Sequence, residues 1–363
     1  MTALKTAICD PLGLKYPIFG FTHSVDVCVE VTRAGGMGIL GATRSTPEEI
    51  RRDLAEIRSR VGNLPFGVDL VLPKGMPERN NREEIEAQLP GEHRTFVEHI
   101  IEKYNVPPAK QAGMRSRFVR SEETAARQID VVLASDVDVF ACGIGSPVEA
   151  IREAKAGGKK VISLVGAPKH ARAAIASGVD MLVAQGYDAG AHTGTIGTFS
   201  LVPQIVDVAG DIPVLAAGGV ATGRHIAAAL ALGAVGVWIG TAWLVTKENH
   251  THPLILQKLL AAGSDDTVIS RADSGKTLRQ VRTAWSDEWA AKDAPAPLKM
   301  PYQDILVGDL LGAIDQHAVE PLMHSPAGQG IAMFNEETTT AAVMARLVSE
   351  AEAALSRVQG ATA

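Results

Sequence analysis

Eight short apolar runs rich in β-branched residues recur along the chain and alternate with stretches of helical spacing. They cover residues 16–20, 37–41, 66–72, 137–142, 160–165, 181–185, 213–217 and 235–239. Strands that alternate with helices in this way are typical of parallel sheets joined by crossover helices, and eight such units close a barrel. The sequence therefore predicts an α/β fold of the (β/α)8 TIM-barrel type and not an open doubly wound sheet.

The helices expected between the strands begin with recognisable capping signals. Thr46 precedes a proline and two glutamates, and Ser121 and Ser146 open similar segments with acidic residues in the first turn. A Ser or Thr side chain accepts a hydrogen bond from a free amide of the first turn, and acidic residues there interact favourably with the helix dipole. We therefore expect helices to begin beside these three residues.

Residues 73–120 interrupt the repeat after the third strand. They are polar and rich in Pro, Arg and Glu, with helical apolar spacing at Phe96, Ile100, Ile101 and Tyr104. Because they leave the C-terminal end of a strand, we expect a helical excursion at the active face of the barrel.

A second interruption follows the eighth unit. Residues 266–363 read as helices and loops, with large apolar residues at Trp285, Trp289, Met300 and Met323. We expect this C-terminal helical extension to pack on the barrel or over its mouth, so that it and the excursion border a substrate cavity. The barrel itself then comprises residues 1–72 and 121–265.

Charge and composition exclude several classes of partner. The 35 basic and 41 acidic residues are spread along the sequence, the net charge is −6 and aromatic residues make up only 4%, so nucleic acid is not an expected partner. The N-terminus lacks the apolar core of a signal peptide, and no apolar run reaches the roughly 18 residues of a membrane span. We therefore expect a cytoplasmic protein without a membrane partner. The widely spaced Cys9, Cys28 and Cys142 are expected to be buried thiols.

The stretch from Gln185 to Gly194 contains the most informative candidate. It follows the sixth strand, which places it at the active face of a barrel. Glycines at 186, 190 and 194 allow a close approach to a flat ligand, and His192 is presented among small residues on what reads as a loop. His192 is therefore the candidate catalytic residue. The alternative is a histidine packed for structural reasons.

Two glycine-containing turns follow the seventh and eighth strands. Gly218 and Gly219 lead into a helix that starts near Thr222, and Gly240 and Thr241 repeat the design one strand later. Backbone amides at such turns, together with the positive end of a helix, bind phosphate. Turns after strands seven and eight form the phosphate site of many (β/α)8 barrels.

The end of the first strand supplies the other half of a cofactor site. Phe19, Gly20 and Phe21 place a small residue where the backbone can lie under a planar ring. Phosphate-binding turns at one side and such a floor at the other are what FMN requires. The alternative is a set of tight turns that hold no ligand.

On these residues the chain resembles the nitronate monooxygenase family, formerly called 2-nitropropane dioxygenases. The resemblance is carried by residues 185–194 and 216–223, by Gly240 with Thr241 and, more weakly, by residues 327–329. It implies FMN bound without a covalent link and His192 beside the flavin. The cofactor contacts that it implies are Asp69, Gln185, Gly190, Gly218, Gly219, Gly240 and Thr241.

Several positions depart from the family pattern. Ala191 stands where a second glycine usually precedes the histidine, Asp188 where Glu is common, and Asp69 where relatives often have Asn. The end of the first strand also lacks the Ala-Pro-Met usual there. An ionised Asp cannot donate a hydrogen bond as Asn does, so the flavin contact at Asp69 differs in kind unless its carboxyl is protonated.

The expected function is oxidation of a small-molecule substrate, an alkyl nitronate, with O2 by an FMN-dependent monooxygenase. His192 would stabilise the charge of the nitronate or act as a base toward a neutral nitroalkane, and no metal is required. NAD(P)H-dependent flavin reductases of the quinone or enoyl-acyl-carrier-protein type share the motifs and are the alternative. A non-catalytic barrel that binds a phosphorylated ligand is a minor alternative. His23, after the first strand, either faces the flavin or has a structural role.

Overall fold

The computed structural model describes residues 4–73, 75–114 and 116–361. Within them, eight parallel strands form a closed barrel in which the last strand pairs with the first. Their order is β1 (Ile18–Thr22), β2 (Met37–Gly41), β3 (Gly67–Val71), β4 (Val139–Gly143), β5 (Lys160–Val165), β6 (Met181–Gln185), β8 (Val214–Ala217) and β9 (Gly236–Ile239). Each strand overlaps one of the eight predicted runs, and the (β/α)8 barrel is confirmed.

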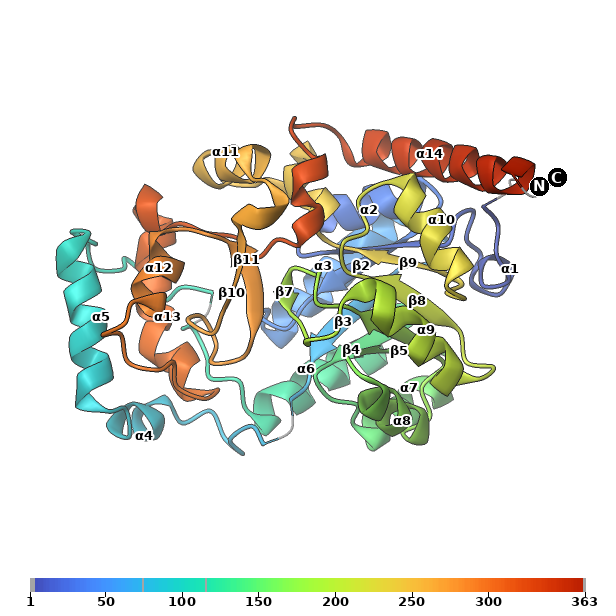
Figure 1. Cartoon of the computed structure of the whole chain (residues 1–363). Helices are drawn as coiled ribbons and strands as arrows, with labels where there is room; N and C mark the ends of the chain where they lie inside the picture. The colour runs from blue at the N-terminus through green and yellow to red at the C-terminus, as the bar shows by residue number, and fades with distance from the viewer. Residues whose placement is uncertain (1–3, 74, 115, 362–363) are drawn as a thin grey trace.

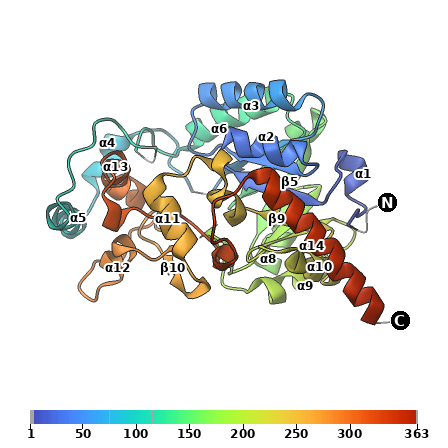
Figure 2. The ribbon, with the colours of Figure 1, turned by 90° about the horizontal axis from the view of Figure 1, so that it is seen from above.

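Helices cross the outside of the barrel between successive strands, as Figures 1 and 2 show. They are α2 (Val25–Arg33), α3 (Pro47–Val61), α6 (Glu122–Ala134), α7 (Val148–Ala156), α8 (Pro168–Ala176), α9 (Thr198–Ala209) and α10 (Gly223–Ala231). Apolar side chains between these helices and the strands form the largest core cluster of the described residues.

Two of the three predicted helix caps are present. Thr46 forms a capping box with Glu49 at the start of α3, and Ser121 accepts a hydrogen bond from the amide of Thr124 at the start of α6. Ser146 caps nothing, because α7 begins two residues later and the Ser146 hydroxyl lies 2.9 Å from the hydroxyl of Ser163 on β5.

The interior of the barrel is filled by side chains and closed at one end. Phe19, Ile39, Val183 and Leu215 are among the fully buried residues of this inner cluster. The short helix α1 (Cys9–Leu12) contributes Cys9 to the same cluster and so covers the N-terminal end of the strands. A ligand can therefore enter only at the C-terminal end, which is the active face of such barrels.

The C-terminal extension contains a pair of strands that the sequence does not predict. β10 (Thr267–Ser270) and β11 (Leu278–Val281) pair antiparallel, and β11 also pairs with β7 (Ala191–His192). The expectation of helices and loops alone is therefore wrong here. Because each of these strands is at most four residues long, none gives a period-2 pattern that could be read from the sequence.

Helices of the excursion and of the C-terminal extension pack together beside the barrel. α4 (Arg82–Ala87) and α5 (Gly91–Lys103) lie against α13 (Tyr302–Gln316), and the Phe96 ring contacts the Trp289 ring of α12 (Ala284–Ala290) edge-on, 4.9 Å between centroids. We call α4, α5, α12, α13, β10 and β11 the cap. In Figure 1 the cap occupies the left of the molecule and the barrel the right, and β7 lies between them.

The remaining elements follow the last barrel strand in the sequence. They are α11 (Pro253–Ala261), α14 (Thr340–Ala361) and the short 3-10 helices η1 (Thr241–Val245), η2 (Lys247–Asn249), η3 (Ser264–Asp266), η4 (Glu320–Leu322) and η5 (Gln329–Met333). The long helix α14 packs along α10 and α2, as Figure 2 shows. No helix within the described ranges is long and apolar enough to cross a membrane. The prediction of three buried thiols is confirmed, since all three cysteines are free and buried.

Candidate active site

A cavity of about 1410 Å³ opens at the C-terminal ends of the barrel strands. Its walls come from the turns after the strands and from the loop between β10 and β11 of the cap. Ligand pockets usually measure about 300–1,000 Å³, so this cavity has room for a cofactor and a substrate together. The cavity is therefore the candidate active site.

Most of the predicted site residues line this cavity. They are Phe21, Asp69, Gln185, Gly190, His192, Gly218, Gly219, Gly240 and Thr241. Phe19 and Gly20 lie outside it. The Phe19 ring is fully buried inside the barrel, 6.4 Å from the Trp238 ring, and a side chain on Gly20 would meet Val31 at 2.8 Å on the outer side of β1.

The excursion and the C-terminal extension were both expected to border the cavity, but of the two only the extension has described residues that line it. Arg271, Gly275, Lys276 and Thr277 of the C-terminal extension line it, whereas no described residue of 73–120 does. The apolar side chains of the excursion pack against those of the C-terminal extension, so the excursion lies behind the extension and not at the cavity.

His192 is held from two sides by hydrogen bonds. Its Nε2 atom lies 2.8 Å from the Ser274 hydroxyl of the cap, and its carbonyl oxygen accepts a bond of 2.6 Å from the side-chain amide of Gln185 on β6. The residue is not on a free loop as predicted, because it belongs to β7 and pairs with Leu278 of β11. Its half-buried imidazole therefore has a defined orientation in the cavity wall.

The residue before it has an unusual backbone. Ala191 has φ +60°, in the left-handed region, where a side chain costs roughly 1–2 kcal/mol. The neighbouring Gly190 could not carry a side chain, since a Cβ there would lie 2.7 Å from the amide nitrogen of Gly328. Residues 327 and 328 thus pack directly on the histidine turn, which gives the weak motif near the C-terminus a position at the site.

The two glycine turns present unobstructed backbone to the cavity. Gly218 and Gly219 have φ of +100° and +71°, and only glycine adopts such values readily. A Cβ on Gly240 would meet no described atom closer than 3.8 Å. Thr241 opens η1, and its hydroxyl accepts a hydrogen bond of 2.9 Å from the Gly328 amide.

Two amides at the start of α10 have partners within the protein, where the sequence suggested a phosphate. The Gly223 amide donates to the Glu350 carboxylate of α14 at 2.8 Å, and the Thr222 amide donates to His225 Nδ1 at 3.2 Å. An anion in this part of the cavity would therefore depend more on the amides of the two glycine turns.

Asp69 is a buried acid at the end of β3. It is 3% exposed, lines the cavity, and its Oδ1 atom has no hydrogen-bond partner among the described residues. Burial raises the pKa of this carboxyl to about 7. A substantial fraction is thus protonated at neutral pH and able to donate a hydrogen bond to a ligand.

Two cationic groups approach each other beside the cavity. Burial and the nearby Arg120 guanidinium lower the pKa of Lys276, and no described carboxylate forms an ion pair with this lysine. Arg120 is almost fully buried and donates to the carbonyl oxygen of Val71 at 3.1 Å. Lys276, Arg120 and Ser274 belong to no motif that singles them out in the sequence, and Ser274 reaches His192 through the packing of the cap.

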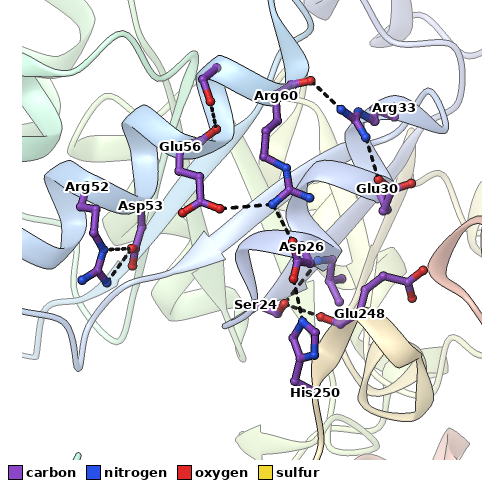
Figure 3. Close-up of polar contacts among 12 residues, drawn as sticks. Ser24, Asp26, Glu30, Arg33, Arg52, Asp53, Glu56, Arg60, Glu248 and His250 are labelled. Atoms are coloured by element: carbon purple, nitrogen blue, oxygen red, sulfur yellow. Dashed lines mark hydrogen bonds and ion pairs between the residues drawn. The ribbon is translucent and has the colours of Figure 1, made fainter.

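A polar network supports the opposite rim of the cavity (Figure 3). Asp26 of α2 accepts hydrogen bonds from His250 Nε2, at 2.6 Å, and from Arg60 of α3. The His250 bond, followed by the Arg60 bond, lowers the pKa of the Asp26 carboxyl. His23 also lines the cavity, and its Nδ1 atom donates to the Gly41 carbonyl at 2.7 Å, which is the structural contact that the sequence left open.

Comparison with known proteins agrees with this geometry. A model of the nitronate monooxygenase family matches residues 9–350. The chain belongs to the nitronate monooxygenase family. A candidate monooxygenase of Mycobacterium tuberculosis, Rv1533, is 42% identical over 329 residues, which cover 88% of this chain and 87% of that protein. A candidate nitronate monooxygenase of Staphylococcus aureus strain Newman is 30% identical over 341 residues and covers 90% and 91%.

Solved structures place the chain in the same group. A nitroalkane oxidase from Streptomyces ansochromogenes superposes with a TM-score of 0.83 at 27% identity and covers 97% of this chain and all of that one. FabK from Thermotoga maritima superposes with a TM-score of 0.77 at 26% identity and covers 99% of each chain. The family resemblance is confirmed, and the chain is an oxidoreductase of a flavin-dependent family.

Proposed function

We propose that the chain is an FMN-dependent nitronate monooxygenase, which oxidises alkyl nitronates with O2. The observation that carries the proposal is the fixed His192 imidazole, which lies in one wall of a cavity large enough for two ligands and bordered by two bare glycine turns. Family membership supports the reaction class.

The residues of the cavity fit FMN. Gly218, Gly219, Gly240 and Thr241 offer amides and a hydroxyl at the turns where a phosphate would lie. The orphaned Oδ1 atom of Asp69 offers a hydrogen bond to a polar edge of the ring system. When bound, the flavin would supply the electron transfer from the nitronate to O2.

The chain's own residues would bind and neutralise an anion. A nitronate carries a negative charge, and the ammonium of Lys276 in the cavity wall would attract it. His192, with one nitrogen at Ser274, would use its ring to hydrogen-bond the nitro oxygens or to accept a proton from a neutral nitroalkane. The cap closes one side of the cavity and so reduces access of water to the bound substrate.

A flavin reductase that uses NAD(P)H is the second candidate. The likeness to FabK over 99% of both chains favours it, and the cavity would also accommodate part of a dinucleotide. Among the described residues no carboxylate pairs with Lys276, whose ammonium could therefore attract the anion of either substrate.

Anaerobic mixing distinguishes the candidates. The purified yellow protein is mixed with propionate 3-nitronate, with ethyl nitronate or with NADH, and flavin absorbance is followed. We expect rapid bleaching by a nitronate and slow bleaching by NADH. Rapid bleaching by NADH alone would identify a reductase, and a colourless protein that cannot be reconstituted with FMN would indicate a binding barrel.

A further inference from the structure

A buried cluster of three side chains lies directly behind the residue that contacts His192. Asp273 is completely buried, and its two carboxylate oxygens accept hydrogen bonds from different partners. Oδ1 accepts from the Trp285 indole at 2.9 Å, and Oδ2 lies 3.0 Å from His324 Nε2. The Trp285 and His324 rings are stacked, with 5.9 Å between centroids and 6° between planes.

The contacts of His324 define its protonation. Its Nδ1 atom lies 3.1 Å from the carbonyl oxygen of Leu322, and a carbonyl oxygen only accepts, so Nδ1 carries a proton. Nε2 faces the Asp273 carboxylate, which also accepts. His324 Nε2 and Asp273 Oδ2 therefore share one proton in a buried hydrogen bond, and the Trp285 indole is stacked on the imidazole.

This pair anchors the turn that holds the candidate catalytic histidine. Asp273 precedes Ser274, whose hydroxyl lies 2.8 Å from His192 Nε2. The preceding carbonyl, that of Ala272, accepts a hydrogen bond of 2.6 Å from Gln303 of α13. A side chain on Gly275, the next residue, would meet the Leu298 carbonyl at 2.0 Å. The cap therefore fixes the turn on both sides of Ser274.

We propose that Asp273 and His324 are positioning residues for the active site, which hold Ser274 where its hydroxyl orients the His192 ring. They touch neither substrate nor cofactor, because neither of them lines the cavity. The proposal rests on the catalytic role proposed for His192. It assigns a function to the buried Asp273–His324 pair. If this pair served folding alone, its removal would not change the orientation of His192.

The test compares variants of the flavin-loaded protein. Asp273→Ala removes both acceptor oxygens. Asp273→Asn keeps the shape, since its amide oxygen accepts from Trp285 and its amide nitrogen donates to a neutral His324. Asp304→Ala is the matched control, because Asp304 is a buried carboxylate of the cap that pairs with Arg44 at 2.7 Å, outside the cavity. Trp285→Phe is a further variant, which removes the indole hydrogen bond and part of the ring that stacks on His324 but keeps the Asp273 carboxylate.

Three quantities are measured for each variant, and NMR and kinetics are recorded below its melting temperature. Nitrogen-15 NMR of labelled histidine, assigned by loss of one signal in His192→Ala, reports the hydrogen bonding of His192 Nε2. Steady-state kinetics give kcat and KM with a nitronate, and thermal melts give stability.

Both alanine variants should melt at a lower temperature, but only Asp273→Ala should shift the His192 signals and lower kcat, by about tenfold or more, with little change in KM. Asp273→Asn should restore most of kcat. Trp285→Phe should shift the His192 signals in the same direction by less.

The inference is overturned if the His192 signals and kcat of Asp273→Ala and Trp285→Phe match those of Asp304→Ala. If the His192 signals shift and kcat does not, Asp273 positions His192 but His192 is not catalytic, and the function proposed above needs another acid–base group.

Discussion

Ser274 Oγ lies 2.8 Å from His192 Nε2, although the two residues are 82 positions apart in the chain. One belongs to the cap and the other to the segment after the sixth barrel strand. The cap thus orients the imidazole, whereas the glycine turns belong to the barrel. Each part of the site can therefore be tested by itself.

His192→Ala should lower kcat with a nitronate about 10²-fold, equivalent to about 2.7 kcal/mol, because one hydrogen bond to developing charge is lost. Flavin content should stay the same, since no glycine turn is altered. The measurement is steady-state kinetics under O2, together with flavin absorbance and thermal melts. A packed structural histidine would instead give a lower melting temperature and near-normal turnover.

Gly219→Asp and Gly240→Asp should release FMN. Each places a carboxylate where a phosphate dianion would lie, and like charges in contact cost several kcal/mol in a partly buried site. Gly219→Asn is the control for backbone strain, because it places an uncharged side chain of the same shape at the same φ of +71°. If both aspartate variants fold and keep full flavin occupancy, the phosphate does not bind at these turns.

Asp69→Asn should change how the stability of the flavin-free protein depends on pH. The folded pKa of about 7 lies above the ordinary value of 3.8, so the stability linked to this proton is fully present below pH 3.8 and is lost as pH rises to about 7. The Asn variant does not lose it. Its stability relative to the natural chain should therefore increase by a few kcal/mol between pH 4 and pH 8 in urea unfolding.

Glu49→Gln is the control for this pH effect. Against the effect of burial, hydrogen bonds from the Thr46 amide and from Arg117 lower the pKa of the Glu49 carboxyl, so its stabilising contribution is present above pH 4.5 and is lost only as pH falls below that value. Its stability difference from the natural chain should be constant between pH 5 and pH 8. An equally flat difference for Asp69→Asn would show that Asp69 ionises normally.

Ala191→Gly should stabilise the protein by up to about 1 kcal/mol. Relief of the left-handed backbone at φ +60° gains roughly 1–2 kcal/mol, and the extra freedom of glycine in the unfolded chain offsets about 0.5–1 kcal/mol of it. Gly190→Ala, one residue earlier, should destabilise, since its methyl group would meet the backbone of residues 327 and 328. Urea unfolding of both variants checks the opposite signs.

The barrel could be predicted from the sequence because each of its strands is an independent signal. The runs at 37–41, 160–165 and 181–185 have the same bounds as β2, β5 and β6. A buried parallel strand is a continuous apolar run, so its identity does not depend on its partners.

The site could be predicted only where its residues carry a local signature. Gly218, Gly219 and His192 belong to turns that follow predicted strands, and all three line the cavity. Ser274 and Lys276 lie in a short turn with no motif of its own, and only the pairing of β11 with β7 brings them to the imidazole. Phe19 and Gly20 were expected at the site because the end of β1 reaches it, but the pleat of the strand directs them elsewhere.

Because β7 pairs with β11 of the cap, the flavin absorbance of a preparation and its catalytic activity depend on different parts of the molecule. The glycine turns belong to the barrel, whereas the orientation of His192 belongs to residues 273 and 274 of the cap. A molecule whose cap has loosened would stay yellow while its imidazole turned away from the substrate. Flavin absorbance would then overstate the fraction of competent enzyme, and active-site titration with a nitronate would be the appropriate measure of concentration.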